Sequence, residues 1–269
     1  MSTKISKDEL REPDAFLKSM ETGLSFLEKY AKAIAAIVAI AIVGTLIYSL
    51  MGYLERRKEN HAQEAFYTVD AKYAKLKEGF EKVKMQAIIP DVAGKDKKSE
   101  GTPASGDVQK DYGSVITDLQ TVQTSNPGTK AAAQAGLDLA EIYMSYKQPE
   151  KAAEAVSLSA RALSHDELMG GLSYMMWGNA LAAKGDCTQA IEMWQKVISV
   201  KTVSYLHPDA TLRTGICYEN LKQNDKAIEM YKRASQEFAD SSAGQTAKTL
   251  LRALEMKNKT PGAAGEQHG

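Results

Sequence analysis

The chain has 269 residues, of which 43% are hydrophobic and 25% are charged, enough to build one or two domains around a core. Its 34 basic and 34 acidic residues cancel, which argues against a general nucleic-acid-binding protein. It has two cysteines, Cys187 and Cys217, too few for a disulfide-built miniprotein or a four-cysteine zinc site.

The N-terminal residues 1–32 predict a tail that contains a short amphipathic helix. Within 13–29, Phe16, Met20, Leu24 and Leu27 recur at helical intervals, after a proline suited to a first turn. We expect this helix to lie at a membrane surface or to bend into the apolar segment that follows, and a docking site for a partner is the alternative.

Residues 33–54 carry no charge and predict a transmembrane helix. At about 1.5 Å per residue the segment is ~33 Å long, which matches the hydrocarbon core of a bilayer. The alternatives are a buried core helix and a cleaved signal peptide. A core helix rarely runs so far without a polar face, and a signal sequence is shorter and starts nearer the N-terminus. We therefore predict a single-pass anchor in membrane lipid.

The charges that flank this segment do not decide its orientation. The positive-inside rule compares basic residues on the two sides, and here each side carries four. They are Arg11, Lys18, Lys29 and Lys32 before the segment, and Arg56, Arg57, Lys58 and Lys72 after it.

Residues 55–89 predict a stalk that is also the first repeat helix. Between 59 and 88, apolar residues alternate at spacings of four and three, which gives one apolar stripe. Its members are Ala62, Phe66, Val69, Tyr73, Leu76, Phe80, Val83 and Ala87. This stripe could join a second copy of the chain in a homo-oligomer. We favour packing against the next helices of the same chain. Residues 90–107 are rich in Gly, Pro, Ser and Lys and predict a flexible loop.

Residues 108–257 predict helices separated by short turns, and no sheet. Turn residues such as Gly185-Asp186 recur at intervals that suit helical hairpins, while no segment alternates as a strand does. The predicted fold class is all-α, with the transmembrane helix followed by an α-solenoid of about four hairpins. Residues 242–257 would form a capping helix, and residues 258–269 a disordered tail.

The segment 174–197 resembles a tetratricopeptide repeat. Small residues fall where the two helices of a hairpin would cross, and large ones where they would fill the gap to the next hairpin. These positions are Gly178, Leu181, Ala190, Trp194 and Val197. A second copy contains Gly215, Ala227 and Tyr231, and a weaker one contains Ala140 and Ala152. The alanines at 152, 190 and 227 lie farther apart than the usual period of about 34 residues, so longer turns are expected.

This layout, over about residues 15–255, resembles the ancillary SecYEG translocon subunits of bacteria. The resemblance implies a cytoplasmic tail, a single pass through the inner membrane, and repeats in the periplasm that bind the translocon and exported clients. The implied role is help with protein translocation or periplasmic chaperone hand-over. The alternative is a structural organiser or assembly factor of another envelope complex.

No motif predicts an enzyme, a cofactor or a metal site. The four histidines lie outside known zinc-binding motifs, and no glycine-rich nucleotide loop or nucleophile elbow occurs. His165 precedes Asp166 and Glu167, but this cluster is more readily a helix start than a set of metal ligands. We predict a binding protein without catalytic activity.

The resemblance also implies a binding groove along the first helix of each hairpin. The residues expected to line it are Gln134, Leu137, Glu141, Met144, Leu172, Met175, Asn179, Ala182, Asp209, Leu212, Ile216 and Glu219. Met175 and Leu212 stand where a carboxylate clamp would need lysines, so the sequence favours an apolar groove. The alternative is that these Leu and Met residues are buried beneath another helix.

Cys187 and Cys217 belong to consecutive repeats. A bridge between them would require Cα atoms within about 7 Å and an oxidising compartment. We predict two buried free thiols rather than a disulfide.

Overall fold

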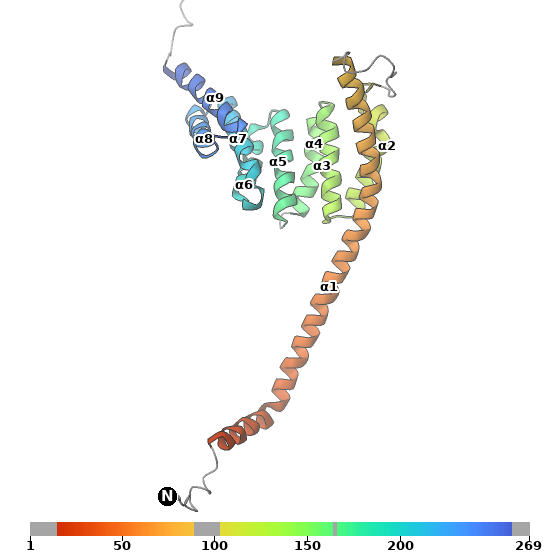
Figure 1. Cartoon of the computed structure of the whole chain (residues 1–269), viewed down its shortest axis with the longest axis vertical. Helices are drawn as coiled ribbons and strands as arrows, with labels where there is room; N and C mark the ends of the chain where they lie inside the picture. The colour runs from red at the N-terminus through yellow and green to blue at the C-terminus, as the bar shows by residue number, and fades with distance from the viewer. Residues whose placement is uncertain (1–14, 89–102, 164–165, 260–269) are drawn as a thin grey trace, which may run out of the picture. The chain divides into compact units, whose positions relative to one another are not determined.

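A computed structural model describes residues 15–88, 103–163 and 166–259, and every regular element in these ranges is a helix (Figure 1). The predicted all-α class is confirmed. Residues 1–14, most of the predicted 90–107 loop and most of the predicted 258–269 tail lie outside the described residues, whereas residues 15–29 of the predicted amphipathic segment are helical. The chain divides between Arg57 and Lys58 into two compact units, which are described separately.

The first unit contains the N-terminal part of α1, a helix that runs from Ala15 to Ile88. Within the described chain, this helix alone is long and apolar enough to cross a membrane. Its most apolar window has a mean hydropathy of 2.5 and no buried residue, whereas a soluble core helix would be mostly buried. The polar Thr45 donates its hydroxyl to the Ile42 carbonyl at 2.8 Å, so this group is satisfied within the helix.

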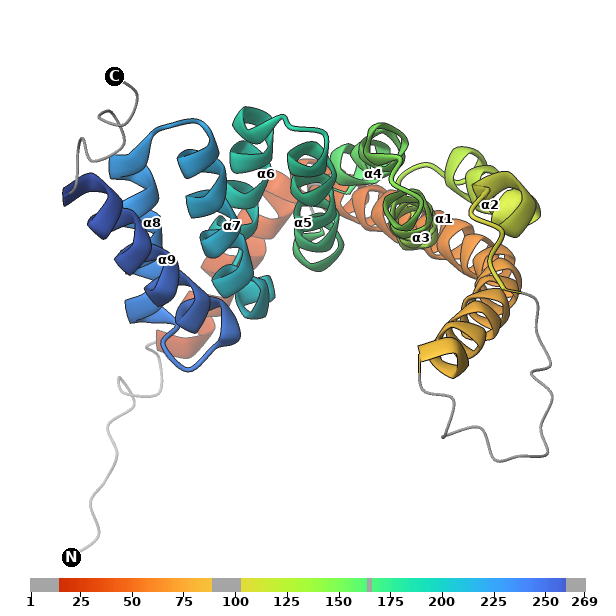
Figure 2. The same ribbon diagram turned by 90° about the horizontal axis from the view of Figure 1, so that it is seen from above.

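The second unit is a succession of helices that pack mainly on their neighbours in chain order (Figure 2). They are α2 (Val108–Ser125), α3 (Lys130–Ser145), α4 (Pro149–Ala162), α5 (Glu167–Ala183), α6 (Cys187–Ser199), the 3-10 helix η2 (Lys201–Leu206), α7 (His207–Asn220), α8 (Asn224–Glu237) and α9 (Ser242–Lys259). At the starts of α2, α3, α5 and α6 a side chain accepts hydrogen bonds from free backbone N–H groups, as Asp166 does from Met169. The predicted turn clusters thus separate the helices.

Glycine opposite an aromatic ring closes two of the hairpins, whereas the sequence placed these rings in the gap to the next hairpin. A Cβ atom at Gly178 would lie 2.5 Å from Nε1 of Trp194, and one at Gly215 would lie 2.6 Å from Cε1 of Tyr231. Both rings are buried. The α3–α4 hairpin uses polar groups instead. A Cβ atom at Gly136 of α3 would meet the Ser159 hydroxyl of α4, and Gln123 of the preceding α2 donates to the Ala155 carbonyl at 2.7 Å. This difference explains why its sequence match is weaker.

The connection η2 accounts for part of the long spacing between repeats. It adds six residues between α6 and α7, and its Val203 is fully buried. A Cβ atom at Gly171 of α5 would lie 2.7 Å from a Val203 methyl group, so glycine is needed there for close approach. The insertion is therefore part of the core.

The C-terminal part of α1 packs against α2 and α3. Ala62, Phe66 and Val69, from the predicted apolar stripe, are buried there. The Glu59 carboxylate accepts hydrogen bonds from the backbone N–H groups of Lys130 and Ala131, at 2.8 and 3.2 Å, and so caps α3 from another helix. This is the packing within one chain that the sequence favoured.

The prediction of two free thiols is wrong, because Cys187 and Cys217 form a disulfide. Cys187 begins α6 and Cys217 lies in α7, and the two Cα atoms are 5.1 Å apart. The sequence shows that the two repeats are consecutive. It does not show that the connection η2 directs α7 back along α6, so that the two cysteines come within bonding distance.

Candidate protein-binding site

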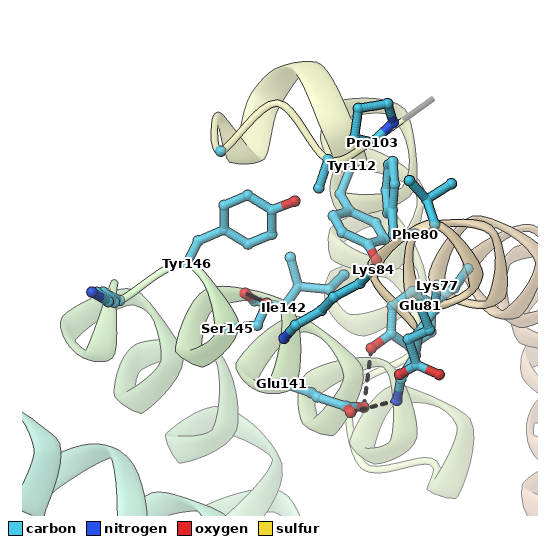
Figure 3. Close-up of a pocket in the computed structure, with 15 residues that line it drawn as sticks. Lys77, Phe80, Glu81, Lys84, Pro103, Tyr112, Glu141, Ile142, Ser145 and Tyr146 are labelled. Carbon is cyan, nitrogen blue, oxygen red and sulfur yellow. Dashed lines mark hydrogen bonds and ion pairs between the residues drawn. The ribbon is translucent and has the colours of Figure 1, made fainter. Parts of the chain in front are cut away.

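A cavity of about 680 Å³ lies between the end of α1, the start of α2 and the end of α3 (Figure 3). This volume falls in the range of small-molecule and side-chain binding sites. Apolar and aromatic groups make up most of its wall, and several charged groups stand among them. All of its lining residues belong to the second unit.

Four aromatic rings form the apolar part of the cavity wall. Tyr73 and Phe80 are seven residues apart, on one face of α1, and both contact Tyr112 of α2 edge to face. Tyr146, at the end of α3, contacts Tyr112 from the other side with ring centroids 5.9 Å apart. Three helices thus contribute to one aromatic cluster, which leaves ring surface facing the cavity.

Glu141 of α3 organises the polar side of the cavity. It accepts hydrogen bonds from the Tyr73 hydroxyl at 3.0 Å and from Nζ of Lys77 at 2.5 Å (Figure 3). The hydrogen bond to Glu141 raises the pKa of Lys77, and burial together with Glu141 raises the pKa of Tyr73. At neutral pH the lysine is therefore charged and the phenol is a donor.

Tyr146 is held at the cavity by Asp111. Its hydroxyl donates to Oδ2 of Asp111 at 2.7 Å, and burial followed by this hydrogen bond raises its pKa. Asp111 also accepts from the backbone N–H groups of Ser105 and Gly106, at 3.0 and 3.2 Å. These contacts fix the entry to α2 against the end of α3, so the ring is positioned before any ligand arrives.

One carboxyl group near this site is poorly satisfied. Oδ2 of Asp138 on α3 is buried and has no hydrogen-bond partner among the described residues. Burial, with the nearby charges of Asp70 and Glu141, raises the pKa of Asp138 from 3.8 to about 7, against an opposing effect of Lys77. The protonated form is thus favoured in the folded chain.

Asp138 should make the domain less stable as the pH rises from about 4 to about 7. Over this window the folded state holds a proton that the unfolded state has released, so the free energy of unfolding falls. The loss is complete above the folded pKa. We expect Asp138→Asn to raise stability at pH 8 by roughly 1–2 kcal/mol and to change it little at pH 4.

Urea denaturation at pH 4 and pH 8, followed by tryptophan fluorescence, measures this effect. Asp240→Asn is the matched control, because Asp240 is exposed beyond α8. Equal stabilisation by Asp138→Asn at both pH values would contradict the role given to this carboxyl group.

The residues expected to line the groove are mostly half-buried, and several have partners within the chain. Glu141 belongs to the aromatic cavity, Asn179 accepts from the Trp194 indole at 3.3 Å, and Glu219 accepts from the Tyr231 hydroxyl at 2.9 Å. Met175 and Leu212 are buried in core clusters. The others are placed as follows: Gln134 bonds to Gln63, Asp209 pairs with Arg213, Leu137, Met144, Leu172 and Ala182 pack beside core clusters, and Ile216 is 37% exposed.

The groove itself stays a prediction, and the cavity is a different site that shares Glu141 with it. The sequence placed Tyr73 and Phe80 on the stripe of the first helix, but it gave no sign that Tyr146 joins them. The sequence does place an aromatic residue, Tyr146, at the turn that ends α3, just before Lys147, and this position could have marked it as a candidate. No group of three or more potential metal ligands lies together in the described part of the chain.

Comparison with known proteins supports the repeat architecture. A family model described as a tetratricopeptide repeat matches residues 175–242, which include the Gly178–Trp194 and Gly215–Tyr231 pairs. Proteins with such repeats are generally scaffolds for other proteins. A solved structure titled "Crystal structure of MamA" is similar at 20% identity with a TM-score of 0.39, covering 59% of this chain and 96% of that one. A search of curated proteins found no match.

Proposed function

We propose that this chain is a scaffold anchored in the bacterial inner membrane, whose repeat domain binds protein partners on the periplasmic side. The observation that carries the proposal is that one helix, α1, contains an apolar, unburied stretch and also the first packed segment of a tetratricopeptide-like domain. A domain built to bind proteins is thereby tied covalently to a segment suited to a membrane.

The Cys187–Cys217 disulfide supports the periplasmic side. Disulfides persist in the oxidising periplasm and are rare in the reducing cytosol. The balanced flanking charges leave the orientation open, so the disulfide adds an argument independent of them. With the repeats outside, the role favoured by the resemblance is to assist exported proteins at the translocon or to pass them to periplasmic chaperones.

Crosslinking in living cells, followed by mass spectrometry of the purified full chain, tests this proposal. We expect crosslinks from residues 58–269 to translocon subunits and to proteins in transit. Recovery of one fixed set of other envelope proteins would favour the alternative, an organiser of a different complex. A variant without residues 33–54 is the control, and it should leave the membrane fraction after an alkaline wash. Loss of the full chain in that wash would contradict the anchor.

A further inference from the structure

We propose that the cavity between α1, α2 and α3 binds a short extended peptide in which an aromatic side chain stands between acidic residues. This inference rests on the proposed function as a protein-binding scaffold, and it names the site and the chemistry of the bound segment. The site lies apart from most of the groove expected from the sequence and shares Glu141 with it.

The aromatic half of the ligand follows from the cavity wall. Phe80 and Tyr112 meet edge to face with centroids 5.4 Å apart, and Tyr146 stands nearly perpendicular to Tyr112, at 85°. Rings in such arrangements can accept a further ring in edge or offset contact, which is more favourable than area burial alone. Because the cavity holds about 680 Å³, one aromatic side chain fits with space for its backbone.

The acidic half follows from the charges around the cavity. Lys77 and Glu141 form an ion pair and neutralise each other. The other charged residues that line the cavity are Lys84, Lys147 and Glu81. Neither of these two lysines forms an ion pair within the described residues. Among these lining residues, two lysines against one glutamate give a positive balance, which attracts carboxylates and repels basic segments. The Asp111 carboxylate beside the cavity already accepts from the Tyr146 hydroxyl and from the N–H groups of Ser105 and Gly106.

The two lysines come from different segments of the chain. Lys84 lies near the end of α1, and Figure 3 shows its side chain extending past Ile142 towards Ser145. Lys147 follows α3 with a φ of 56°, held by backbone hydrogen bonds from Lys147 to Met144 and from Gln148 to Tyr143. Acidic residues on both sides of a bound aromatic residue would therefore give each lysine a carboxylate partner.

Fluorescence anisotropy with synthetic peptides tests this proposal on the full chain in zwitterionic lipid nanodiscs. The labelled probe is GSGDFDGSG, and the comparison peptides are GSGKFKGSG and GSGDADGSG. We expect the probe to bind, and both comparison peptides to bind about tenfold more weakly or not at all, because each lacks one half of the recognised chemistry. Empty nanodiscs measure any binding to lipid.

The lysines are tested with a double variant, Lys84→Gln with Lys147→Gln. We expect this variant to bind the probe about tenfold more weakly than the unchanged chain. The difference between variant and unchanged chain should shrink as the salt concentration is raised, because salt screens the lysine charges. The matched control is Lys75→Gln with Lys222→Gln, since Lys75 is exposed on α1 and Lys222 has the same backbone conformation as Lys147, with a φ of 60°. The control should stay within about twofold of the unchanged chain.

Three results would overturn the inference: no binding of the probe, equal binding of the lysine peptide, or equal losses in the test and control variants. None of these would affect the membrane anchor or the partners found by crosslinking, which test the proposed function separately. Conversely, a chain that binds the probe but leaves the membrane in an alkaline wash would contradict the proposed function and leave this site in place.

Discussion

Replacing Tyr231 with alanine is expected to lower the free energy of unfolding of the repeat domain by about 3–5 kcal/mol, the range for truncating a large buried aromatic residue. Its side chain is fully buried, and its hydroxyl donates to Glu219 at 2.9 Å. The ring also occupies the space that Gly215 leaves open, so its removal creates a cavity where α7 and α8 cross. Glu219 would lose its partner as well.

Urea denaturation followed by tryptophan fluorescence measures this loss in the full chain. The only tryptophans, Trp177 and Trp194, both lie in the α5–α6 hairpin, so the signal reports on the repeat domain. Tyr205→Ala is the matched control, because Tyr205 is 62% exposed on η2, and it should change stability by less than about 0.5 kcal/mol. Equal effects of the two substitutions would contradict the packing described for the α7–α8 hairpin.

The sequence predicts the hairpins well because their causes are local. A small residue on one helix and a large one sixteen positions later face each other whenever two helices are joined by a short turn, as at Gly178 and Trp194. The turn residues and the helix-capping side chains are equally local. The helices and the small and aromatic positions of the repeats could therefore be predicted without a structure, although the contact of each ring with the glycine of its own hairpin was not.

The candidate cavity could not be predicted in this way, because it forms where residues that are distant in the sequence come together in the fold. Tyr73 and Tyr146 are far apart in the chain, and they meet Tyr112 only because α1, α2 and α3 pack together. Helical spacing shows which face of a helix is apolar. It does not show whether that face meets a neighbouring helix or a partner, which is why Met175 and Leu212 were expected in a groove and lie in core clusters.

The disulfide leads to the second large expected effect, and it also tests the proposed compartment. Chain purified from the cell envelope should show no free thiol after denaturation without reductant. Residues 58–269 produced in the cytosol should show two, because glutathione and thioredoxin keep thiols reduced there. Free thiols in the envelope protein would remove the argument that places the repeats in the periplasm.

Reduction of this bond should lower the free energy of unfolding by about 3–4 kcal/mol. The bridge joins residues 30 positions apart, and a closed loop of that length restricts the unfolded chain by about this amount in the chain-entropy account. Both cysteines are buried, so reductant should act slowly on the folded protein and faster in urea. Unfolding with and without dithiothreitol measures the difference, and Cys187→Ala with Cys217→Ala is the control, which should not respond to reductant. If reduction leaves the stability of the unchanged chain as it was, the bridge does not link α6 to α7 in the way that the structure places it.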